Sequence, residues 1–159
     1  MELQCHQFWC WAAVAASISK YYDSASRFEQ CVIANMELER GDCCDVPCHQ
    51  DDVDFDRPNT LGSPLNQVDC LHSWVRNPVR LPKIEGEINA KKPLCLRTVW
   101  SDGSAHFVAI IGYDPDNKLL KVADPLVVGE RILTCAAVRN DYPPDHGHWS
   151  DTFYTKSPG

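Results

Sequence analysis

The sequence predicts an α+β fold in which helices come first and an antiparallel sheet follows. Apolar residues recur three and four positions apart in the first half of the chain. The second half holds short runs of β-branched and apolar residues separated by turn signals. Helices and strands segregated in this way are typical of α+β folds and not of alternating α/β folds. With 159 residues, 44% of them hydrophobic, the chain is long enough to bury its own core.

The first helix is predicted over residues 10–22, CWAAVAASISKYY, where four alanines favour helix and permit close packing. The same periodicity predicts further helices over residues 27–38 and 65–75, and a short one over residues 84–91. Between the second and third helices, residues 41–64 are rich in Asp, Pro and Cys. We expect them to form a long irregular loop.

This loop is strongly acidic. Six aspartates lie between Asp42 and Asp56, with no Lys or Arg among them. A run of this kind is ordinarily a solvated surface. The alternative is a recognition surface for a basic substrate segment or for an inhibitor protein.

After residue 92 the pattern changes to that of strands. Strands are predicted over residues 93–100, 105–114, 117–125 and 131–138, with a last one near residues 152–155. Short turns between the first three predict an antiparallel meander. We therefore expect a single domain, residues 1–159, with a helical lobe over about residues 1–92 and a β lobe over about residues 93–159.

Charge and hydropathy exclude two classes of partner. Fifteen Lys and Arg residues against 22 Asp and Glu residues give a formal net charge of −7, which argues against a nucleic-acid partner. The apolar run over residues 8–18 is too short to span a bilayer and lacks the basic flank and cleavage site of a signal peptide. We expect no membrane partner.

Nine cysteines are many for a cytosolic enzyme and suggest passage through an oxidising compartment. If one of them is catalytic, eight remain, and eight can pair. Cys43, Cys44, Cys48 and His49 lack the spacing of a zinc site, so disulfides or structural thiols are the preferred interpretation, and no metal or other cofactor is expected. Adjacent cysteines are poorly placed to bond each other, so Cys43 and Cys44 need separate partners.

Cys10 is the candidate nucleophile, because it opens the first predicted helix. A helix N-terminus favours the thiolate form through its free N–H groups and its dipole. A nucleophilic cysteine also needs a base, a group that orients the base, and donors for the oxyanion.

Three further residues supply these needs. His106 begins a predicted strand, and Asp124 ends the next one. In a hairpin of this size the end of the second strand returns beside the start of the first, so the Asp124 carboxylate can reach the His106 ring. Gln4 lies six residues before Cys10, where its side-chain amide can donate to an oxyanion beside the Cys10 N–H.

These residues lie in motifs that together resemble a known family. Gln4-x5-Cys10-Trp11-Ala12, AHFVAIIGY at residues 105–113 and Asp124-Pro125 resemble the papain-like cysteine peptidases across most of the chain. Further matches resemble the avirulence-effector branch of bacterial papain-like peptidases, and staphopain-type and bacteriocin-processing peptidases look like more distant relatives. The motifs of that closer match are Gln30-Cys31-x-x-Ala34-Asn35, Cys43-Cys44 and Cys48.

The resemblance implies a papain-like fold, with the helical lobe packed on the sheet lobe, and a cysteine endopeptidase acting on a protein substrate. It implies Cys10 as nucleophile, His106 as general base and then acid, Asp124 as the orienting group, and Gln4 with the Cys10 N–H as oxyanion donors. Trp11 and Trp149 are candidates for the wall of the active site. Papain has Asn in place of Asp124, and His49 stands where the closer branch is expected to have Asn.

The resemblance also implies a bacterial effector or toxin that is secreted or delivered into a target cell, with an inhibitor or immunity protein as a further partner. Two other classes of function stay open at this point. One is an acyltransferase or glutamine deamidase that uses the same Cys-His-Asp chemistry, because a fold does not choose the substrate. The other is a disulfide-stapled binding module in which Cys10 is paired and catalytically silent.

Overall fold

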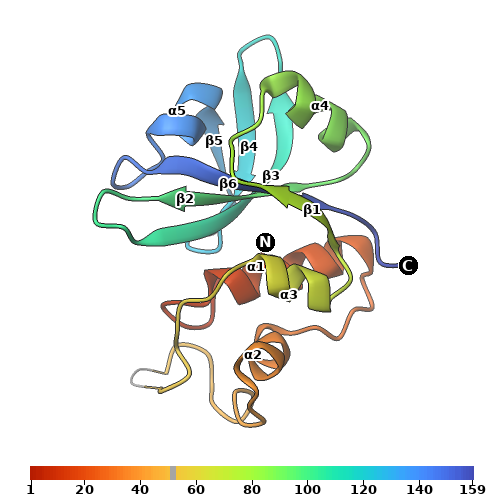
Figure 1. The fold of residues 1–159 in the computed structure, drawn as a ribbon, viewed down its shortest axis with the longest axis vertical. Coiled ribbons are helices and arrows are strands. Elements are labelled where there is room, and N and C mark those ends of the chain that lie inside the picture. The colour runs from red at the N-terminus through yellow and green to blue at the C-terminus, as the bar shows by residue number, and fades with distance from the viewer. Residues whose placement is uncertain (51–52) are drawn as a thin grey trace.

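The computed structural model describes residues 1–50 and 53–159, and over these residues the chain forms five helices and one six-stranded antiparallel sheet (Figure 1). The helices are α1 (Cys10–Tyr22), α2 (Gln30–Leu38), α3 (Gly62–Gln67), α4 (Leu81–Asn89) and α5 (Cys135–Asn140). The strands are β1 (Leu71–Val75), β2 (Leu94–Val99), β3 (Ala105–Asp114), β4 (Leu119–Ala123), β5 (Glu130–Thr134) and β6 (His148–Thr155).

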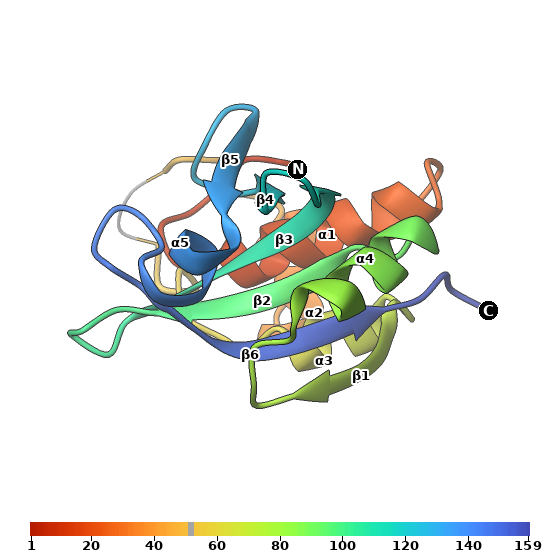
Figure 2. The same cartoon turned by 90° about the horizontal axis from the view of Figure 1, so that it is seen from above.

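The strands follow the order β1-β6-β2-β3-β4-β5, and each neighbouring pair is antiparallel. Helices cover both faces of this sheet: α1, α2 and α3 lie on one side, and α4 and α5 lie on the other (Figures 1 and 2). The α+β prediction is confirmed, and the arrangement is consistent with a papain-like fold.

The alternation of side chains along the central strands produces two cores. Cys95, Phe107 and Ala109 face the core that they share with α1, α2 and α3. Their neighbours along β2 and β3, Leu96 and Val108, belong to the second core, beneath α4 and α5. Successive residues of a strand point to opposite faces, so β2 and β3 are apolar on both.

Helix α1 begins and ends at the predicted residues and is buried along most of its length. All four of its alanines are fully buried. Small side chains at these positions let α1 lie close to α2, α3 and β3, which it contacts. The prediction of a buried first helix is confirmed, and it fixes the position of Cys10 between the helices and the sheet.

Two predicted elements are wrong in part. Residues 65–75 do not form one helix: α3 ends at Gln67, Asp69 takes a left-handed conformation with φ 54°, and β1 then pairs with β6. Residues 131–138 divide into β5 and α5, where the Thr134 hydroxyl accepts a hydrogen bond from Ala137 N–H and caps the helix. In both places a turn or cap interrupts an apolar pattern that periodicity alone reads as continuous.

The boundary between the lobes also differs from the predicted one. Strand β1 lies at the edge of the sheet, and α4 packs against β2 and β3 through Ile84 in the second core. Both elements fall within residues 1–92, the expected helical lobe, but β1 belongs to the sheet and α4 packs on the face of the sheet opposite α1. The first strand begins at Leu71.

Disulfides link Cys5 to Cys48 and Cys31 to Cys44. Of the eight cysteines other than Cys10, which could all have paired, four do so, and the free thiols of the described chain are Cys10, Cys43, Cys70, Cys95 and Cys135. As expected, Cys43 and Cys44 do not bond each other. None of the helices in the described parts of the chain is long and apolar enough to cross a membrane.

Candidate active site

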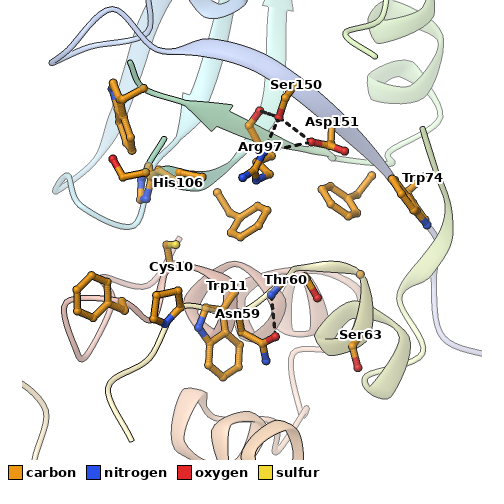
Figure 3. A pocket seen from close by; sticks show the side chains of 18 of the residues that line it. Cys10, Trp11, Asn59, Thr60, Ser63, Trp74, Arg97, His106, Ser150 and Asp151 are labelled. Atoms are coloured by element: carbon orange, nitrogen blue, oxygen red, sulfur yellow. Dashed lines mark hydrogen bonds and ion pairs between the residues drawn. The ribbon is translucent and has the colours of Figure 1, made fainter. Parts of the chain in front are cut away.

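A cleft of about 1280 Å³ separates the helical lobe from the sheet, and Cys10 and His106 line its opposite walls (Figure 3). The helical wall also carries Trp11, Asn59, Thr60 and Ser63. The sheet wall carries Trp74, Arg97, Ser150 and Asp151. Figure 3 shows the Cys10 side chain directed from the start of α1 toward the His106 ring. A polypeptide lying in this cleft would therefore contact both residues.

Cys10 is the first residue of α1, and only 7% of it is exposed. Trp9 precedes it as N-cap and gives the helix no side-chain hydrogen bond. The N–H groups of the first turn are thus available to stabilise negative charge at the thiol and at an atom bound to it. The sequence-based expectation about the position of Cys10 is met.

His106 and Asp124 are joined by a hydrogen bond of 2.8 Å between His106 Nε2 and Asp124 Oδ1. His106 is at the start of β3, and Asp124 follows the last residue of β4. The antiparallel register of the two strands brings these positions together, as the hairpin argument predicts. Because Nε2 is engaged by the carboxylate, Nδ1 is the ring nitrogen that remains for Cys10.

The electrostatics favour a protonated imidazole. Burial lowers the pKa of His106, but hydrogen bonds and charge from Asp124 and Cys10 outweigh it and raise the pKa to about 9. Burial raises the pKa of Asp124, but its interaction with His106 and further hydrogen bonds, one from Arg131, hold that pKa well below its usual range. The pair is therefore an imidazolium and a carboxylate at neutral pH.

Asp124 is held by three more donors that the sequence did not identify. Leu126 N–H donates to Oδ1 at 2.9 Å, and Arg131 Nε and the Tyr142 hydroxyl each donate to Oδ2 at 2.9 Å. Asp124 is 1% exposed, and Tyr142 is fully buried. No local motif marks Arg131 or Tyr142, because only the folded chain brings them to this carboxylate. The result is a carboxylate with one orientation toward His106.

Gln4 is buried at the start of the loop that leads to Cys10, and its backbone N–H donates to Pro125 O at 2.9 Å. Its side-chain Nε2 donates to His6 O at 2.9 Å and to Gln7 O at 2.5 Å. Both N–H groups of the amide are thus used within the loop in this structure. The predicted role of Gln4 as oxyanion donor stays a prediction.

The tryptophans are arranged differently from the expectation. Trp11 lines the cleft, as expected of a wall residue. Trp149 instead lies in the second core, 4% exposed, with its Nε1 donating to Asp151 O. Trp100 stacks on His106, with the ring centroids 5.9 Å apart. The prediction that Trp149 forms part of the wall is therefore wrong. Strand β6 begins at residue 148, and its pleat directs the Trp149 side chain into the core.

Three of the aspartates in the acidic loop are engaged in contacts within the protein. Arg40 forms ion pairs with Asp42 and Asp54, at 2.7 and 3.0 Å. Asp56 accepts hydrogen bonds from the backbone before Cys10. Residues 51–52, two of the six aspartates, lie outside the described residues. Within residues 1–50 and 53–159, no group of three or more His, Cys, Asp or Glu side chains is arranged to hold a metal ion.

The other free thiols differ from Cys10 in their surroundings. Burial raises the pKa of Cys70 to about 11, and it raises the pKa values of Cys43, Cys95 and Cys135 as well. A raised pKa keeps a thiol protonated and poorly nucleophilic. Of the cysteines described, Cys10 is the one that combines a free thiol with a facing histidine and a cleft.

Comparison with protein families matches residues 1–135 to the family described as papain-like cysteine protease AvrRpt2. The match includes the segments that carry Gln4, Cys10, His106 and Asp124. It ends before Tyr142, which completes the hydrogen bonds around Asp124. Comparison with curated proteins gave no match.

Proposed function

The chain belongs to the papain-like cysteine proteases of the AvrRpt2 family, and from this membership we propose that it is an endopeptidase that works through Cys10, His106 and Asp124. As a protease it acts on protein. The observation that carries the assignment of the three residues is the His106–Asp124 hydrogen bond of 2.8 Å, opposite a free thiol at the start of α1. The sheet shared by the two cores supports a single peptidase domain over residues 1–159.

The proposed reaction is acyl transfer to Cys10. The thiolate attacks the carbonyl carbon of the scissile peptide bond, and negative charge moves to the carbonyl oxygen. His106 gives its proton to the amide nitrogen, and the C–N bond breaks. The amine product departs, and the acyl group remains on Cys10 as a thioester. Water, losing a proton to His106, then attacks the thioester. The acid product departs, and the thiolate and imidazolium are restored.

The oxyanion is held, in this proposal, by the N–H of Cys10 and by the Gln4 amide. Gln4 becomes a donor to it when one of its two hydrogen bonds inside the loop is exchanged for one to the oxyanion. Asp124 keeps the His106 ring in place and stabilises its charged form, and it does not itself take the proton.

The proposed biological setting is an effector or toxin of bacterial origin that is secreted or delivered into a target cell, with an inhibitor or immunity protein as a possible partner. The two disulfides support passage through an oxidising compartment, since such bonds persist outside the cytosol.

The experiment compares wild type with Cys10→Ala on a proteome-derived peptide library, with new termini identified by mass spectrometry. We expect wild type to create new termini and Cys10→Ala to create none, because removal of the nucleophile leaves no route to the thioester. Circular dichroism checks that the variant is folded. Equal cleavage by the variant would refute the mechanism.

The same experiment separates the alternatives. A glutamine deamidase on the same site would release ammonia and leave the peptides uncut. A silent binding module would show neither activity, and the free thiol of Cys10 already opposes it, because that reading requires Cys10 to be paired.

A further inference from the structure

The loop over residues 4–9, which we call the nucleophile loop, precedes Cys10 and is held by one of its own side chains and by side chains from other parts of the chain. Within the loop, the Gln4 amide donates to His6 O and Gln7 O. Near its start, Cys5 N–H donates to Gln30 Oε1 at 2.9 Å. The backbone geometry that delivers Cys10 to the cleft thus depends on contacts from outside the loop.

Asp56, in the acidic loop, accepts hydrogen bonds from the same backbone through its carboxylate. Its Oδ2 accepts a hydrogen bond from Gln7 N–H at 3.0 Å, and its Oδ1 accepts one from Phe8 N–H at 2.8 Å. A carboxylate has two oxygens and donates nothing when ionised, so it satisfies two consecutive N–H groups at once. These two residues lie immediately before Trp9 and Cys10.

The residues on either side of Asp56 dock on the same segment. Trp9 Nε1 donates to Phe55 O at 3.2 Å, and Trp11 Nε1 donates to Arg57 O at 3.1 Å. Phe55 is 3% exposed and packs against Trp9, with ring centroids 5.7 Å apart. Four hydrogen bonds thus join three consecutive residues of the acidic loop to the segment from Gln7 to Trp11.

We propose that Asp56 is a positioning residue of the active site, which fixes the nucleophile loop so that the N–H of Cys10 faces the developing oxyanion. The inference rests on the proposed function. In this proposal Asp56 of the acidic loop supports the backbone before Cys10 and is not part of a recognition surface for a substrate or inhibitor. Among the described residues, the Asp56 carboxylate accepts hydrogen bonds from two backbone N–H groups of the loop and does not line the cleft, so it acts through them and not on the substrate.

The chemistry of the site separates this role from a general effect on folding. Peptide hydrolysis passes through an oxyanion, whereas alkylation of a thiolate by iodoacetamide does not. A change confined to the oxyanion site therefore slows hydrolysis and leaves alkylation of Cys10 unchanged. A loss of the folded site, or of the thiolate, slows both.

The test measures kcat, KM and the rate of Cys10 alkylation for Asp56→Asn, with the disulfides intact. The substrate is a fluorogenic peptide built on a cleavage site from the wild-type experiment above. In Asp56→Asn an amide NH₂ faces one of the two backbone N–H groups, so that hydrogen bond is lost. We expect kcat to fall about 10- to 100-fold, with KM and the alkylation rate unchanged.

Asp45→Asn is the matched control, since Asp45 is an exposed aspartate of the same loop, and its kcat should equal that of wild type. If Asp56→Asn does not fold, Asp56→Ala replaces it, because water can reach the freed N–H groups. A wild-type kcat in the variant, or equal losses of kcat and alkylation rate, would overturn the inference alone. Absence of turnover by wild type itself would overturn the proposed function together with it.

Discussion

His106 carries two opposing influences whose balance sets its charge. Burial disfavours the imidazolium, and the carboxylate of Asp124 with the Cys10 thiol favours it, so that the pKa rises to about 9. The proposed mechanism needs the imidazolium as the acid that protonates the leaving amine. Activity should therefore be lost on the alkaline side, when this proton is lost.

The pH profile of kcat/KM should accordingly have its alkaline limb near pH 9. In Asp124→Asn the negative charge beside the ring is gone, so the pKa of His106 falls. We expect the alkaline limb to move to lower pH by about 1 to 3 pH units. The measurement is kcat/KM from pH 4 to about pH 11 for the two proteins with one peptide substrate.

Asp114→Asn is the control for this shift, because it removes a negative charge from the far end of β3 and should leave the limb in place. An unchanged limb in Asp124→Asn would mean that the pKa of His106 does not depend on Asp124.

The contribution of His106 to the stability of the fold should decrease over the same pH range. The protonated ring stabilises the fold fully below its ordinary pKa of 6.5, and this contribution is lost as pH rises through about 9.

At the scale of elements, the segment between α5 and β6 supports the histidine from two sides. Its Tyr142 hydroxyl donates to Asp124, and a backbone bridge joins Tyr142 to Gly147, with hydrogen bonds of 2.8 Å in both directions. Gly147 lies against Thr98 and Trp100, and Trp100 stacks on His106. This one short segment thus contacts both the carboxylate and the aromatic ring that flank His106.

Gly147→Ala should disturb this arrangement. An added Cβ would overlap Thr98 Oγ1 and would lie 3.2 Å from Trp100 Nε1, so the segment or Trp100 has to shift. We expect stability to fall by about 1 to 3 kcal/mol, as overpacking does, and kcat/KM to fall about 10-fold. Gly41→Ala, where a Cβ meets open space, should change neither. Denaturant titration measures the stability of each variant, and steady-state kinetics measures its kcat/KM. Full activity in Gly147→Ala would mean that catalysis does not depend on the stacking of Trp100 on His106.

The same elements show what the sequence can predict. Residues 10–22 carry a periodic apolar pattern and residues 105–114 an uninterrupted apolar run, and the bounds of both elements were predicted correctly. Residues 65–75 carry an apolar pattern that continues across a turn at Asp69, so one helix was predicted where α3 and β1 occur.

The site divides in the same way. The hairpin register predicts that Asp124 lies beside His106, because His106 is at the start of β3 and Asp124 directly follows β4, the neighbouring strand. Arg131 reaches Asp124 from β5, which pairs with β4, whereas the places of Tyr142, Asp56 and Trp100 depend on how segments outside the strands fold back. No spacing in the sequence encodes these contacts, so they were not predicted.

At the scale of the whole molecule, the proposed catalytic residues come from two parts, the helices and the sheet, which share one core. Cys10 belongs to the helical part, and His106 and Asp124 belong to the sheet, so activity requires that the two keep a fixed relation across the cleft. Helix α1 packs on β3 and provides most of this relation. The disulfides act elsewhere: both lie in the helical part, and Cys5–Cys48 ties the nucleophile loop to the acidic loop.

The two disulfides should therefore differ in their effect on catalysis. Cys5–Cys48 closes a sequence separation of 43 residues, and Cys31–Cys44 one of 13 residues. Loop entropy predicts that replacing each pair with serines lowers the free energy of unfolding by about 4 and about 3 kcal/mol respectively. Cys5 O also accepts a hydrogen bond from His49 N–H at 2.7 Å, next to the Cys5–Cys48 disulfide. Loss of the disulfide therefore loosens the attachment of the backbone that leads to Cys10.

We expect kcat to fall in Cys5→Ser/Cys48→Ser and to stay near the wild-type value in Cys31→Ser/Cys44→Ser, when both are measured at a temperature where each variant is folded. Denaturant titration gives the two stabilities, and kinetics on the same samples gives kcat. An equal loss of kcat in both variants would mean that the disulfides affect activity only through global stability. A loss confined to the first would mean that the anchoring of residues 4–9, and not the helical part as a whole, sets the geometry at Cys10.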